Sequence, residues 1–125
     1  MELEEGMYVR TKQGYIAKFK EYDEMFDMLR FETPIFLRSW MPCDYMQKER
    51  FVNRYFLKAS FDIIDLMEVG DYVNGYKVID ITDYVIVDLK VPTGDSWRCR
   101  EFSENEIKSI VTKEMYASME YKVNE

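Results

Sequence analysis

Two stretches of the chain alternate β-forming and turn-forming residues in the same order. From Gly6 the chain reads Gly-Met-Tyr-Val, then a polar turn of about five residues that ends at Gly14, then a β-rich run. From Gly70 it reads Gly-Asp-Tyr-Val, then the two-residue turn Asn74-Gly75, then a second β-rich run. Asn-Gly between β-forming residues predicts a hairpin, because both turn residues tolerate positive φ. The pattern favours an internal repeat, with chance similarity between two hairpins as the alternative.

The remaining elements continue the same alternation. Residues 84–91 form a near-continuous β-branched run, which predicts a strand that is central or buried on both faces. Turn residues interrupt the chain at 92–95, and residues 97–102 alternate again as a strand. Each half then closes with a short apolar segment, for which Ser60 and Thr112 are plausible helix N-caps.

These elements predict a mainly β fold of the α+β class, built from two tandem SH3-like small β-barrel or meander halves. We place the first half at residues 1–68, with an insertion at about 31–56, and the second at residues 69–125. A short helix closes each half. A unit of about 60 residues buries too little surface to be very stable alone, so we expect the halves to pack as one unit.

The charge balance of the chain bears on its partners. The 125 residues include 24 acidic and 17 basic side chains, a net charge of −7. Such a chain repels phosphate backbones, so we expect no direct nucleic-acid binding. The charge suits a basic surface on another protein, and it also suits solubility alone. No apolar run approaches the roughly 20 residues that span a bilayer, so we expect no membrane association.

The chemistry of the side chains argues against catalysis. The chain has no histidine, which removes the commonest general base, the nucleophile–histidine pairs and most zinc sites. The five glycines are scattered, so no phosphate-binding loop is present. We therefore expect no enzyme activity, no cofactor and no metal. Cys43 and Cys99 lack ligand spacing, and the acidic N-terminus lacks a secretory pattern, so we expect reduced thiols in a cytoplasm.

Two sets of charged residues are candidates for partner binding. Between residues 30 and 58 the chain carries six basic and three acidic side chains. Arginines alternate there with aromatic residues, a composition that binds anions and π faces. The alternative is that the aromatics are core and the arginines solvated. The second set is a run of carboxylates that would imitate a phosphate backbone if they shared one face; otherwise they are the polar side of an element. The candidates are Arg38, Trp40, Arg50, Arg54 and Tyr55, and Asp62, Asp65, Glu68 and Asp71.

Three stretches resemble one group of proteins. Residues 60–78, residues 107–123 and the opening at 7–12 are similar to signatures of small accessory proteins of phages and prophages of Gram-positive bacteria. The middle of the chain, residues 22–55, matches no such pattern. The resemblance implies a phage accessory protein acting in the cytoplasm of the bacterial host, and it assigns no activity.

Small acidic phage proteins without catalytic residues often inhibit bacterial defence. Our leading hypothesis is a non-enzymatic inhibitor of antiviral defence, an anti-CRISPR protein that binds a Cas effector and blocks nucleic-acid binding or cleavage. One alternative is a sponge for an immune nucleotide second messenger, in a monomer or across a homo-oligomer interface. It would use the arginine–aromatic set, or Arg98 and Arg100 with Trp97. Another alternative is a plain phage interaction or assembly module.

Overall fold

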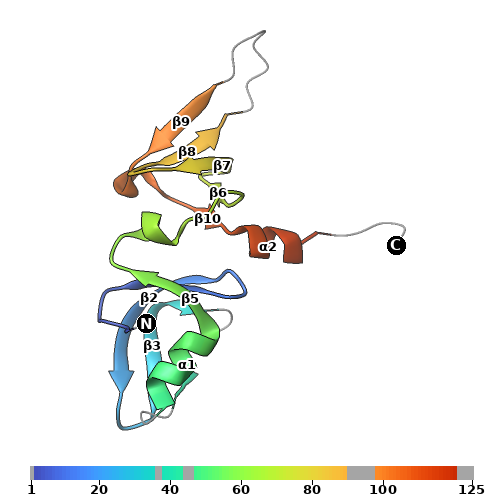
Figure 1. The fold of residues 1–125 in the computed structure, drawn as a ribbon. Coiled ribbons are helices and arrows are strands. Elements are labelled where there is room, and N and C mark those ends of the chain that lie inside the picture. Colours follow the sequence, from blue (N-terminus) through green and yellow to red (C-terminus); the bar gives the residue numbers. More distant parts are fainter. Residues whose placement is uncertain (1, 36–37, 44–46, 90–97, 121–125) are drawn as a thin grey trace. The chain divides into compact units, whose positions relative to one another are not determined.

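A computed structural model describes residues 2–35, 38–43, 47–89 and 98–120, with only the backbone described at 33–35, 38 and 39. The chain divides into two compact units, Met1–Leu66 and Met67–Glu125, here called the first half and the second half. The boundary lies two residues before the predicted one. Figure 1 shows the elements of both halves.

The first half is a five-stranded antiparallel sheet with the strand order β4-β3-β2-β1-β5. Its elements are β1 (Tyr8–Thr11), β2 (Ile16–Asp23), β3 (Met28–Ile35), β4 (Arg38–Pro42), α1 (Lys48–Tyr55), β5 (Phe56–Ser60) and the 3-10 helix η2 (Ile63–Leu66). The predicted insertion at 31–56 therefore contains part of β3, all of β4 and the helix that leads into β5. That region belongs to the sheet and its crossover.

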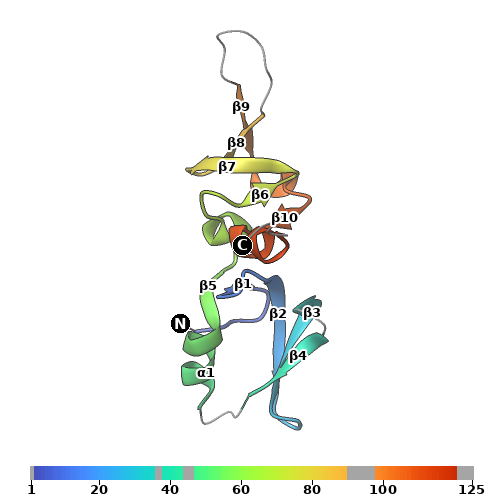
Figure 2. The same cartoon turned by 90° about the vertical axis from the view of Figure 1, so that its right-hand side faces the viewer.

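The second half repeats this arrangement with shorter elements, in the order β10-β6-β7-β8-β9. Figure 2 shows β6 between β7 and β10. The elements are β6 (Tyr72–Val73), β7 (Tyr76–Ile81), β8 (Val85–Asp88), β9 (Cys99–Phe102), the 3-10 helix η3 (Glu104–Glu106), β10 (Ile110–Val111) and α2 (Lys113–Ser118).

In both halves a meander of four strands is followed by a helical turn and a fifth strand that pairs with the first. The mainly β fold is confirmed. Within the described residues no ladder joins the two outer strands of either sheet, so the predicted closed barrel is not seen. A short helical segment follows the fifth strand in each half, η2 in one and α2 in the other.

The repeat extends to the backbone hydrogen bonds in front of each first strand. The N–H of Gly6 donates to the carbonyl of Phe19 at 2.9 Å, and the N–H of Gly70 donates to the carbonyl of Val78 at 3.0 Å. The residue after each glycine accepts a return bond of 2.7 Å from that same partner. Both glycines have positive φ, at 92° and 100°, a conformation that side chains disfavour. The two halves therefore share one main-chain frame.

The predicted Asn-Gly hairpin is confirmed. Asn74 and Gly75 have φ of 53° and 86° and join β6 to β7, as a tight turn with two positive φ angles requires. The β-branched run forms β8, which is central between β7 and β9. Its burial alternates, with Val85 and Val87 fully buried and the residues between and after them half-buried. The prediction of a central or doubly buried strand is therefore met by its internal position, with one face fully buried.

Each half has its own apolar interior. In the first half Phe31 lies between Phe19 and Phe56, with edge-to-face ring contacts at 5.8 and 5.9 Å. Its buried core consists of Leu3, Val9, Ala17, Phe19, Leu29, Phe31, Cys43, Val52 and Phe56. In the second half the buried apolar residues are Met67, Val73, Val78, Val85, Val87 and Phe102.

Cys43 is buried and Cys99 is exposed, and both are free thiols. Across the described ranges, each helix falls short of the length and apolar character that crossing a bilayer requires.

Candidate functional site

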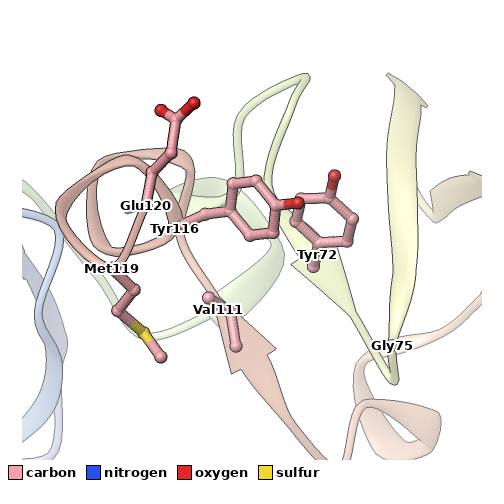
Figure 3. A pocket seen from close by; sticks show the side chains of 6 residues that line it. All are labelled: Tyr72, Gly75, Val111, Tyr116, Met119 and Glu120. Carbon is pink, nitrogen blue, oxygen red and sulfur yellow. The ribbon is translucent and has the colours of Figure 1, made fainter. Parts of the chain in front are cut away.

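The second half carries a groove of about 510 Å³ beside α2. Figure 3 shows the side chains around it. They come from β6, the hairpin turn, β10, α2 and the two residues after it, and they are Tyr72, Gly75, Val111, Tyr116, Met119 and Glu120. Four of the six are apolar or aromatic, and Glu120 is the one charged member. This composition is typical of a site that binds another molecule through apolar contact.

The geometry of the groove depends on how α2 begins. Thr112 is fully buried, and its Oγ1 accepts the N–H of Met115 at 3.3 Å, so the predicted N-cap is confirmed. The carboxylate of Asp71 accepts the N–H of Lys113 at 2.9 Å and the N–H of Glu68 at 2.7 Å. The start of α2 is thereby held against the segment that leads into β6.

An ion pair reinforces the same junction. Lys113 Nζ lies 2.7 Å from Glu68 Oε1. The hydrogen bond to Glu68 raises the pKa of Lys113 above its ordinary value. The amine of Lys113 is therefore directed to Glu68, and it is not among the residues that line the groove.

With its first turn fixed, α2 presents an aromatic ring to the sheet. The rings of Tyr116 and Tyr72 stack with centroids 4.7 Å apart and planes inclined by 22°. Tyr116 remains 55% exposed and Met119 77% exposed, and none of the six residues of α2 is buried. Polar contacts and one ring stack thus hold the helix, and its apolar side chains stay open to solvent.

Tyr8 pairs with Ser60 in the first half as Tyr72 pairs with Val111 in the second, but among the described residues of the first half no ring stack on Tyr8 matches the Tyr72–Tyr116 pair. Lys18 Nζ lies 5.7 Å from the ring of Tyr8. The shared frame therefore carries a different surface in each half.

The predicted arginine–aromatic set is brought together in part. Arg50, Arg54 and Tyr55 of α1 line a hollow of about 160 Å³ with Gln47 and Phe51. The rings of Phe51 and Tyr55 lie 4.6 Å apart, and the guanidinium of Arg54 lies 5.5 Å from the ring of Tyr55. This corner can offer positive charge and ring faces to a small anion.

The other members of that set lie on β4. Trp40 is 38% exposed and is not among the described residues that line the hollow. Arg38 belongs to the backbone of β4, and its side chain lies outside the described part. In the alternative basic set, the guanidinium carbon of Arg100 lies 4.6 Å from the ring centroid of Phe102. Its Nη2 lies 3.5 Å from Glu106 Oε2. Trp97 lies outside the described residues.

The four predicted carboxylates serve local structure. Asp62 Oδ1 accepts the N–H of Ile64 at 2.9 Å, and Asp65 Oδ2 accepts the hydroxyl of Ser60 at 2.6 Å. These contacts shape η2, as Asp commonly does at a turn. Glu68 pairs with Lys113 as described. Asp71 is 0% exposed, so its carboxylate is not a surface group. The set is divided between the two halves, two members in each.

Sequence reasoning missed the groove because its residues carry no motif. Tyr72 belonged to the predicted hairpin, and Tyr116 and Met119 belonged to the short apolar segment after Thr112. The usable signal was the N-cap at Thr112, which starts an apolar segment that forms a helix of only six residues. A helix of this kind buries little, so Tyr116 and Met119 had to lie near the surface.

Within the described residues, no three side chains of the His, Cys, Asp or Glu type gather where they would hold a metal ion. Comparison of the chain with protein-family models, curated proteins and solved structures finds no match.

Proposed function

We propose that this protein acts by binding another protein, as a phage-encoded, non-enzymatic inhibitor of bacterial antiviral defence in the host cytoplasm. The observation that carries the proposal is the groove beside α2, where Met119 and Tyr116, stacked on the half-buried Tyr72, remain exposed. Tyrosine and methionine are enriched at protein interfaces, since their large side chains gain much from losing water.

The finer form of the proposal is an anti-CRISPR protein that binds a Cas effector and blocks nucleic-acid binding or cleavage. Its support is the net charge of −7, the lack of histidine and the resemblance of three stretches to phage accessory proteins. Nucleic-acid-binding effectors carry basic channels, to which an acidic chain is attracted at long range.

We also propose that each half is a variant of the small SH3-like barrel. The support is the shared order of elements, with four strands, a helical turn and a fifth strand beside the first. Folds of this kind host many functions, so the assignment adds to the fold and leaves the partner to experiment.

The test is capture and inhibition with purified host effectors. The tagged chain is mixed with each Cas effector loaded with its guide, and complex formation and target cleavage are measured. We expect one effector to form a stoichiometric complex and to lose cleavage in proportion to the added chain. Unimpaired cleavage and no complex with every effector would overturn the anti-CRISPR proposal. Co-purification with virion or replication proteins instead would favour a phage assembly module.

A second candidate function rests on the hollow beside α1. Arg50, Arg54 and the rings of Phe51 and Tyr55 surround it, a composition that suits a nucleotide phosphate and base. The protein would then be a sponge for a nucleotide second messenger of host immunity. Calorimetry against cyclic nucleotides and cyclic ADP-ribose isomers tests it, with Arg54→Gln and Arg50→Gln expected to abolish the heat. No heat with any of these compounds would remove this candidate.

A further inference from the structure

We infer that the groove beside α2 receives a lysine or arginine side chain from the surface of the partner protein. This inference rests on the proposed protein-binding function and deepens it by naming the chemistry of the partner. The residues that carry it are Tyr72, Tyr116, Met119 and Glu120.

The first argument is the ring pair. A cation over the face of a tyrosine is attracted by the ring quadrupole, by about 0.5–1 kcal/mol at an exposed site and more when water is excluded. This chain uses that contact repeatedly, for example Lys48 over Tyr22 at 5.5 Å and Arg100 over Phe102 at 4.6 Å. None of the six described residues lining the groove is basic. A cation on this ring pair would therefore come from outside those residues.

The second argument is charge. Glu120 is the one charged residue of the groove lining, and Figure 3 shows it near Tyr116, two residues after the end of α2. Residues 67–120 carry eleven acidic and six basic side chains, a net charge of −5. Lys113, the basic residue of α2, is paired with Glu68 at 2.7 Å. The field at the groove therefore favours a positive side chain and opposes an acidic one.

The third argument is shape. Lysine and arginine place an apolar stem behind a charged head, so they need an apolar wall with a carboxylate at its edge. Val111 and Met119 supply the wall, and the unbranched thioether of Met119 adapts to stems of different length. Glu120 supplies the carboxylate. A purely apolar segment would use the wall and leave the carboxylate without a role.

The experiment uses the whole chain and four capped tripeptides of the form acetyl-Gly-X-Gly-amide, where X is arginine, lysine, norleucine or glutamate. Binding is followed by NMR through the ring signals of Tyr72 and Tyr116. We expect the arginine and lysine peptides to shift these signals with millimolar affinity, at least about threefold tighter than norleucine, and the glutamate peptide to shift neither. Equal binding of the norleucine and arginine peptides would overturn the inference.

Three variants locate the binding. Glu120→Gln is expected to weaken the arginine peptide about threefold and to leave the norleucine peptide unchanged. Tyr116→Leu keeps an apolar side chain without the ring and is expected to remove the preference for arginine. Tyr84→Leu is the matched control, because Tyr84 is 45% exposed and is not among the groove residues. Retention of the arginine preference in Tyr116→Leu would also overturn the inference.

The capture assay separates this inference from the proposed function. If the wild-type chain captures an effector and Tyr116→Leu captures it equally well, the groove is not the contact and the inference fails while the function stands. If the wild-type chain captures no effector but the arginine peptide binds as expected, the anti-CRISPR proposal fails and the groove chemistry stands.

Discussion

The carboxylate of Asp71 accepts the backbone N–H of Lys113 at 2.9 Å, across a separation of 42 residues in sequence. The same carboxylate accepts the N–H of Glu68 at 2.7 Å. One buried side chain therefore joins the entry to β6 with the first turn of α2. Because Tyr116 stacks on Tyr72 from that helix, Asp71 is a positioning residue for the groove.

Replacing Asp71 tests this role. Asp71→Ala leaves two N–H groups without their charged acceptor, so we expect a loss of about 2–3 kcal/mol in the free energy of unfolding. Asp71→Asn keeps one acceptor oxygen and should lose less. Urea unfolding measures both. The control is Asp83→Asn at an exposed turn, expected to change stability by less than about 0.5 kcal/mol. Equal stability of Asp71→Ala and wild type would contradict the role.

The hairpin turn offers a second test, because Asn74 contributes both its backbone angle and its side chain. Its φ is 53°, and its amide group accepts the N–H of Lys108 at 2.8 Å and of Ser109 at 3.1 Å. Asn74→Gly removes the side-chain hydrogen bonds, and glycine adopts the positive φ without strain. We therefore expect a loss of about 1–2 kcal/mol in the free energy of unfolding. Asn74→Ala also places an alanine β-carbon at positive φ, which costs about 1 kcal/mol more. Chemical unfolding of the two variants in parallel checks the order; an alanine variant as stable as the glycine variant would refute it.

The core of the first half gives a matched pair of leucines. Leu29 is 0% exposed and Leu57 is 41% exposed. Leu29→Ala removes buried atoms and leaves a cavity, so we expect a loss of about 3 kcal/mol. Leu57→Ala should change stability by less than about 0.5 kcal/mol. Thermal or urea unfolding measures both losses. Similar losses for the two variants would contradict the burial of Leu29.

Acid sensitivity follows from Asp23. The hydrogen bond from Arg30 Nε, at 2.9 Å, lowers the pKa of this carboxyl below its ordinary value, with the backbone N–H groups of Phe26 and Met25 acting in the same direction. A carboxyl with a lowered pKa stabilises the fold above its unfolded pKa of about 3.9, and that contribution is lost as the pH falls through its folded pKa.

The difference in urea midpoint between wild type and Asp23→Asn should therefore be constant at neutral pH and shrink as the pH falls below about 4. Asp83→Asn serves again as the control. A difference that stays constant down to the lowest accessible pH would show that the Asp23–Arg30 pair does not stabilise the fold.

The two thiols should differ in reactivity. Cys99 is exposed on β9 and Cys43 is buried in the core of the first half. A disulfide-forming thiol reagent should modify Cys99 quickly in the native protein and Cys43 only on unfolding. Cys99→Ser should remove the fast phase and leave the slow one. Rapid modification of both thiols without denaturant would contradict the burial of Cys43.

The sequence predicted the fold most successfully where single residues dictate backbone angles. Gly6, Gly70 and the Asn74-Gly75 pair marked the two hairpins because each requires positive φ. Thr112 marked the start of α2 through its side-chain oxygen. Such local signals need no knowledge of the rest of the chain, and they identified the repeated hairpin.

The candidate site was harder to predict because it depends on long-range contacts. Asp71 is one of the predicted partner-binding carboxylates, yet its side chain is fully buried and bonded to the N–H of Lys113. Tyr116 belongs to the predicted apolar segment after Thr112, and its ring stacks on Tyr72 while the residue stays 55% exposed. Within the basic stretch, α1 gathered Arg50, Arg54 and Tyr55, since Arg50 and Arg54 lie one turn apart and Tyr55 follows Arg54 on the same helix.

The bonds that Gly6 and Gly70 make to the second strand of each half join main-chain atoms alone. The strength of these hydrogen bonds depends little on which side chains occupy the neighbouring positions, provided that the glycines remain. A scaffold of this construction tolerates rapid replacement of its outer residues, so one copy is free to acquire a new binding face while the other keeps its own.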